Sequence, residues 1–230
     1  MHQEKHFKQP AFIRDVIIGL SDGITVPFAL TAGISGAVIG GNSIIITAGI
    51  AEICAGSIAM GLGGFLSAKT EEEHYYSELA REKREIVELY DHEKQEVRDI
   101  FAAYGLSKDT QDTVADEIAK DEAKWVEFMM RYELGLEQPD TTRARRSAMN
   151  IAFSYIIGGL IPLLGYVFTD TPQNGLRDSS IFTILCLIIF GYLKSKFTGQ
   201  DPVTGALKTT AIGILAASAA FGIAYLFNHR

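Results

Sequence analysis

Five long apolar segments constrain the fold of this chain more than any other feature of its sequence. At about 1.5 Å of rise per residue, each could cross a hydrocarbon layer of roughly 30 Å as an α-helix. The predicted spans are Val16–Ile39, Ile44–Leu66, Ala148–Phe168, Ile181–Phe197 and Val203–Phe227. Because a backbone inside lipid must satisfy its own hydrogen bonds, we predict an all-α membrane protein with five transmembrane helices.

Charge separates one soluble segment from these spans. Residues 71–140 hold 21 Asp and Glu against 9 Lys and Arg, whereas the rest of the chain holds 7 against 12. We therefore predict three parts: residues 1–68 with the first two transmembrane helices, residues 69–143 as an acidic domain, and residues 144–230 with the last three helices. An acidic domain repels phosphates, so we expect no nucleic-acid partner.

The basic residues near the span ends predict the orientation. One side of the membrane would carry Lys5, Lys8, Arg14, Lys69, Arg143, Arg145, Arg146, Lys194 and Lys196. The other side would carry only Arg177 and Arg230. The excess of Lys and Arg on cytosolic loops places the N-terminus and the acidic domain in the cytosol. An odd number of spans places the C-terminus on the other side.

The acidic domain is predicted to be helical. No Gly or Pro occurs from Phe65 to Tyr104, so the second span should continue as an unbroken helix of 40 residues, about 60 Å long. Gly105 would end this helix. A second helix would start near Asp109–Gln111, and a third would contain Ala123–Leu134. We thus predict a three-helix cytosolic domain between spans two and three, and the carboxylates of its first helix predict that it binds metal.

Six carboxylates of the long helix share one face. At about 100° per residue they fall within an arc of about 80°, which overlaps the arc of the apolar residues, and the five Lys and Arg of the stretch face elsewhere. The six are Glu71, Glu78, Glu82, Glu85, Glu93 and Glu96. Clustered unpaired carboxylates cost several kcal/mol unless a cation lies among them. The Glu82/Glu85 and Glu93/Glu96 pairs predict two cations about 16 Å apart; a solvated acidic helix is the alternative.

A second face, on the last helix of the domain, carries Glu122, Met129 or Met130, and Glu133. Inward Glu side chains on facing helices are typical of carboxylate-bridged metal sites. Carboxylates with a thioether favour Fe²⁺, Mn²⁺, Co²⁺ or Zn²⁺ over Mg²⁺. We expect no organic cofactor.

Polar residues inside the first two spans predict a path for an ion. Asp22 and Glu52 each cost at least about 2.5–3.5 kcal/mol to insert, so a functional role is favoured. Pro27 lacks an amide hydrogen and frees the carbonyl of residue 23, beside Asp22. Met60 lies two turns from Glu52 and is either a soft ligand or a packing residue. Asp15 is interpreted as an anchor at the membrane surface.

The run Asp22–Gly33, DGITVPFALTAG, resembles the first-span signature of the vacuolar iron transporter family, plant members above all. The resemblance extends through Glu52, Met60, the Glu-rich segment and the Lys194–Gly199 turn. It implies a multi-pass homodimer of the vacuolar membrane, with a lumenal C-terminus and a path between the subunits. It also implies export of Fe²⁺ from the cytosol in exchange for protons.

The same resemblance implies roles for individual residues. The metal ligands would be Glu82, Glu85, Glu93, Glu96, Met129 and Glu133, with Met130 beside them. The path residues would be Asp22, Glu52 and Met60. A membrane-anchored ferritin-like or ferroxidase protein is the alternative, but it would need Glu-x-x-His pairs where this sequence has Glu-x-x-Glu. A metal sensor with structural spans is a third possibility; both rivals leave the acids inside the spans unexplained.

Overall fold

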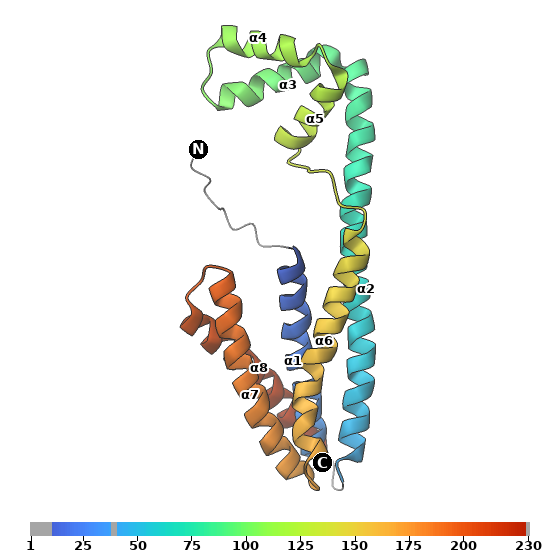
Figure 1. Ribbon diagram of the computed structural model, residues 1–230, viewed down its shortest axis with the longest axis vertical. Helices are drawn as coiled ribbons and strands as arrows, with labels where there is room; N and C mark the ends of the chain where they lie inside the picture. The colour runs from blue at the N-terminus through green and yellow to red at the C-terminus, as the bar shows by residue number, and fades with distance from the viewer. Residues whose placement is uncertain (1–10, 38–40, 229–230) are drawn as a thin grey trace. The chain divides into compact units, whose positions relative to one another are not determined.

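The computed structural model describes residues 11–37 and 41–228, and all regular structure in these ranges is helical (Figure 1). The helices are α1 (Ala11–Ala37), α2 (Ser43–Glu88), α3 (Tyr90–Ala103), α4 (Lys108–Ile118), α5 (Glu122–Tyr132), α6 (Arg143–Val167), α7 (Pro172–Phe197) and α8 (Pro202–Asn228). The predicted all-α class is confirmed. Lys5, Lys8 and Arg230, used above for the orientation, and the Ile39 end of the first predicted span lie outside the described residues.

Five of these helices, α1, α2, α6, α7 and α8, are long and apolar enough to cross a membrane, as predicted. The largest difference concerns α7, which begins at Pro172 rather than at Ile181. Thr171 caps it by accepting a hydrogen bond from the Asn174 N–H at 3.4 Å, and Pro172 occupies the first turn, where its missing N–H costs nothing. The polar residues in the first turns of α7 lower the local hydropathy, so the apolar pattern in the sequence predicted a later start for this helix.

The contacts divide the chain into two units. One contains the described residues of Met1–Phe65 and Ala144–Arg230, and the other is Leu66–Arg143. Close helix crossings hold the first unit together. A Cβ added at Gly23 on α1 would lie 2.4 Å from the backbone oxygen of Tyr155 on α6, and one at Gly191 on α7 would lie 2.8 Å from that of Gly205 on α8. Only glycine permits such an approach, and small residues often mediate helix packing in membranes.

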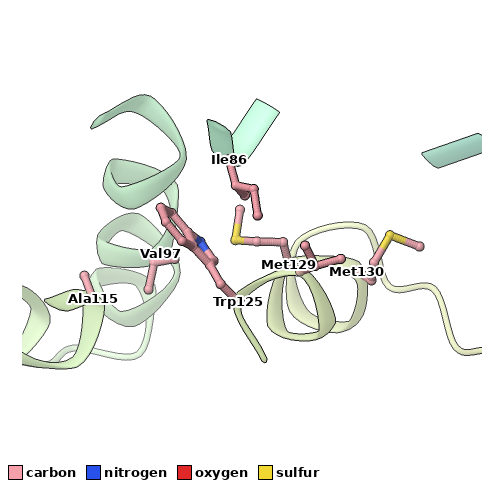
Figure 2. Packing of buried hydrophobic residues seen from close by; sticks show 7 residues of the cluster. Ile86, Val97, Ala115, Trp125, Met129 and Met130 are labelled. Carbon is pink, nitrogen blue, oxygen red and sulfur yellow. The ribbon is translucent and has the colours of Figure 1, made fainter. Parts of the chain in front are cut away.

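The second unit consists of the last part of α2 together with α3, α4 and α5, around one apolar core. The core residues are Ile86, Val97, Ala115, Trp125, Val126, Met129 and Met130. Figure 2 shows the Trp125 and Met129 side chains of α5 extending toward Val97 on α3 and Ile86 on α2. The Trp125 ring also meets the Tyr90 ring edge to face, with 5.2 Å between their centroids. These contacts join all four helical segments.

The predicted unbroken helix from Phe65 to Tyr104 is wrong, because the chain bends at Leu89, between α2 and α3. Leu89 has φ −121° and ψ 33°, outside the helical range, although its N–H still bonds to the Glu85 oxygen at 2.7 Å. The bend lets Ile86 and Val97 enter the same core. Burying an apolar side chain contributes about 1.5–3 kcal/mol, whereas a backbone hydrogen bond contributes about 1 kcal/mol net. Core burial therefore outweighs the interrupted helix.

Candidate metal site and membrane carboxylates

The bend at Leu89 brings together carboxylates from three helical segments. Glu82 on α2, Glu93 on α3 and Glu133 at the end of α5 each offer an oxygen, and these oxygens lie within 4.8 Å of one another. Glu82 and Glu93 are each only 3% exposed, whereas Glu133 is exposed to solvent. One oxygen of Glu82 and one of Glu93 have no hydrogen-bond partner. The three groups form a compact acidic site that is open on the Glu133 side.

Burial dominates the electrostatics of this cluster. Desolvation, followed by the negative charges of Glu93 and Glu133, raises the pKa of Glu82 from 4.5 to about 8. Desolvation and the neighbouring Glu96 raise the pKa of Glu93 to about 7. The pKa of Glu133 is raised as well, by desolvation and then by Glu96 and Glu85. At neutral pH the cluster therefore holds protons, and a divalent cation could replace them.

Two features of the predicted acidic face are corrected by this geometry. A pair of cation sites about 16 Å apart requires a straight helix, whereas the bend places Glu82 and Glu93 in one cluster. The expectation that no base serves this face is also wrong. Arg81 reaches along one turn, and its Nε lies 3.0 Å from Glu85 Oε1. Because both side chains are accessible to water, this ion pair is weak and leaves Glu85 able to exchange partners.

The other acids of the face lie outside the central cluster. Glu96 has an oxygen 3.5 Å from His92 Nε2, Glu78 pairs with Arg81 at 3.7 Å, and Glu71 approaches Arg143 at 3.8 Å. Glu122, predicted to face inward from the last helix, is exposed. The structure therefore separates the six-membered face into a buried centre and a solvated, partly ion-paired periphery.

The two methionines occupy different sides of α5. Met129 is fully buried, and Figure 2 shows its sulfur directed toward Ile86. The Met130 side chain points to the other side of the helix, where it lines a groove of about 530 Å³ with Tyr75 and Leu79. Both methionines belong to the apolar core, so their packing role is established by their contacts. Their role as metal ligands stays a prediction.

In the first unit, Glu52 has a partner that the sequence reasoning missed. The hydroxyl of Tyr155 on α6 donates a hydrogen bond to Glu52 Oε1, while Oε2 is buried without a partner. A Cβ added at Gly56 would meet the Tyr155 hydroxyl at 2.4 Å, and Gly23, next to Asp22, packs on the Tyr155 backbone. Tyr155 therefore lies between the α1 and α2 segments that carry the two acids. A tyrosine in the middle of an apolar span was the available signal.

Two further residues of the first two spans, Pro27 and Met60, were singled out in the sequence. Pro27 lies inside α1 and is fully buried, and its carbonyl accepts a hydrogen bond from Thr31 Oγ1 at 2.8 Å. Met60 is half-buried on α2. The residues predicted to form the path, Asp22, Glu52 and Met60, thus lie on α1 and α2, whereas Tyr155 lies on α6.

Comparison with known proteins identifies the relatives of this chain. The VIT family model matches residues 13–225. The chain is 51% identical to the vacuolar iron transporter of Centaurea cyanus, with 97% of this chain and 91% of the relative covered. It is 49% identical to vacuolar iron transporter 1 of Oryza sativa subsp. japonica, covering 100% and 90%. It is 38% identical to Protein CCC1 of Saccharomyces cerevisiae, covering 92% and 68%. These matches confirm the resemblance seen in the sequence, and the chain belongs to the VIT family.

Proposed function

We propose that this protein is a secondary transporter that moves Fe²⁺ from the cytosol into the vacuole in exchange for protons. The observation that carries the proposal is the pair of membrane acids, Asp22 on α1 and Glu52 on α2, on helix segments that both pack against Tyr155. The names of the relatives, vacuolar iron transporters over nearly the full chain, support iron as the cargo. Mn²⁺, Co²⁺ and Zn²⁺ offer the same ligand chemistry and would compete for these sites.

Exchange follows from the cost of an uncompensated charge in an apolar medium. A carboxylate there is stable only when it holds a proton or lies next to a cation. The buried, unpartnered Oε2 of Glu52 is free to hold either. The same acids cannot hold both cargoes at once, so metal arriving from the cytosol displaces protons, and an acidic lumen returns them.

In this proposal residues 69–143 form a cytosolic domain that binds the same ions before they enter the membrane. Glu82, Glu93 and Glu133 form its centre, and Glu85, Glu96 and Met129 would extend the coordination. The N-terminus lies on the same side as this domain and the C-terminus in the lumen, as the distribution of Lys and Arg favours.

We also propose that two copies assemble in the vacuolar membrane. Four small residues at every fourth position of α2, Ala51, Ala55, Ala59 and Gly63, are all exposed. Such a face permits close approach of a second transmembrane helix. In a chain whose two native cysteines, Cys54 and Cys186, are changed to Ser, a cysteine placed at Ala55 should cross-link two copies in native membranes. A cysteine placed at Leu207, exposed on α8, should not.

The decisive experiment is metal uptake into proteoliposomes with an acidic interior, with a pH dye inside. The wild type should take up Fe²⁺ or Co²⁺ and release protons, and Asp22→Asn or Glu52→Gln should abolish both. Uptake that ignores the pH gradient, with no proton movement, would indicate a uniporter. Consumption of O₂ with Fe²⁺ and no uptake would instead favour the ferroxidase alternative.

A further inference from the structure

Asp15, predicted to be a surface anchor, is buried in the first unit and lacks a charged partner within residues 11–37 and 41–228. Its side chain is 3% exposed, and Oδ1 has no hydrogen-bond partner. Its other oxygen accepts a hydrogen bond from the Asn150 side-chain amide on α6, at 3.5 Å. Among the residues that the structure describes, no Lys, Arg or His forms an ion pair with it. A buried carboxylate in this state costs several kcal/mol unless it is protonated or binds a cation.

The depth of Asp15 is fixed by the helix crossings. On α1, Gly19 packs on Ile151 and Gly23 packs on Tyr155, so α1 and α6 run in the same direction. Asp15 precedes Asp22 by two turns, which places it on the same side of α1 and about 10 Å closer to the helix start.

Met60 lies at a matching depth on α2. A Cβ added at the adjacent Gly61 would lie 3.0 Å from the backbone oxygen of Ala148 and 3.2 Å from the Ala152 Cβ, which flank Asn150 along α6. Met60 is also about 12 Å from Glu52 along α2. The bundle thus has two levels of donor groups, Asp22 with Glu52 and, nearer the α1 start, Asp15 with Met60.

We propose that Asp15 and the Asn150 amide form a further cation-binding site of the membrane bundle, which takes a divalent transition-metal ion before it reaches Asp22. The Asp15 carboxylate supplies the negative charge. Rotation of the Asn150 amide would present its oxygen as a second ligand, and both are donors that Fe²⁺, Co²⁺ and Mn²⁺ accept. The role of this site in transport rests on the proposed function, whereas its ability to bind metal does not.

Binding and transport test the site separately. The full chain with Glu82, Glu85, Glu93 and Glu96 all changed to Gln removes most binding outside the membrane. In this background Asp15→Asn should reduce the Co²⁺ bound at equilibrium dialysis by one ion per chain. In proteoliposomes, Asp15→Asn alone should raise the KM for Co²⁺ about tenfold or more and change the maximal rate by less than about threefold. Asp178→Asn, an acid paired with Arg177 near the start of α7, is the matched control.

Asn150→Ala keeps every charge and serves as the test variant if Asp15→Asn does not fold. It should leave the number of bound Co²⁺ ions unchanged and raise the dissociation constant of one of them about tenfold. The proposal is overturned if Asp15→Asn binds as much Co²⁺ as its background with the same affinity, or if the affinity is unchanged in Asn150→Ala. A wild type that binds Co²⁺ but transports none would refute the proposed function alone, because dialysis reads the site without transport.

Discussion

The buried glutamates of the second unit should make its stability fall as the pH rises, unless a metal ion is present. The pKa of Glu82 is about 8 in the folded chain and 4.5 in the unfolded chain. Between these values the folded state binds more protons than the unfolded state, so the free energy of unfolding decreases with increasing pH. The stabilisation is complete below about pH 4.5 and is lost as the pH passes through about 8.

The size of this effect follows from the shift. A rise of the Glu82 pKa by about 3.5 corresponds to about 5 kcal/mol, which is an upper limit for Glu82 because part of the rise comes from the charges of Glu93 and Glu133. A divalent ion at a hundred times its dissociation constant returns about 2.7 kcal/mol. The metal should stabilise more at pH 8 than at pH 6, because fewer protons must be displaced at the higher pH.

The measurement is hydrogen exchange of the full chain, read by mass spectrometry on peptides from α3 and α5 and corrected for the intrinsic pH dependence of exchange. Wild-type protection should decrease from pH 6 to pH 8 without metal and recover with Zn²⁺ or Co²⁺. The double variant Glu82→Gln with Glu93→Gln should be protected at pH 8 without metal, and metal should not change it. Glu73→Gln, an exposed residue on the same helix, should behave as the wild type.

A double variant that keeps the wild-type pH slope would refute the assignment of the proton linkage to this cluster. A double variant that keeps the full metal response would refute the assignment of the metal site to Glu82 and Glu93.

Three further predictions concern packing and the membrane site. Met129→Ala should destabilise the second unit by about 2–5 kcal/mol, because Met129 is fully buried; the fluorescence of Trp125, the single tryptophan, reports the unfolding. Met129→Leu should destabilise it by less than about 1.5 kcal/mol. A loss of metal affinity in Met129→Leu would assign the Met129 sulfur as a ligand. Gly23→Ala should lower the yield of folded protein in size-exclusion chromatography, because its Cβ would lie 2.4 Å from the Tyr155 oxygen. Gly222→Ala on α8, where no atom lies within 4 Å of the added Cβ, should be tolerated. Tyr155→Phe should reduce metal uptake at least tenfold while leaving metal protection of the second unit unchanged, because it removes the hydrogen bond that the Tyr155 hydroxyl donates to Glu52. Unchanged uptake would show that this hydrogen bond has no role in transport.

The sequence by itself determined the helical class, the five spans and the residues from which a site could be built. These features depend on local properties: hydropathy over about 20 residues, the period of the helix, and the high cost of a carboxylate in an apolar span. Even Gly105, at the end of α3, was readable, since its φ of 80° is one that glycine adopts readily.

Only the tertiary structure decided which of these residues meet. The bend at Leu89 could not be predicted from the sequence, since no Gly or Pro lies near it. It arises from the burial of Ile86 and Val97 around Trp125. That bend brings one carboxylate of each predicted pair, Glu82 and Glu93, into one cluster with Glu133. The hydrogen bond from Tyr155 to Glu52 and the burial of Asp15 against Asn150 join residues more than 100 positions apart. Such contacts depend on how helices cross, and helix crossings are set by packing between segments rather than by the pattern within any one of them.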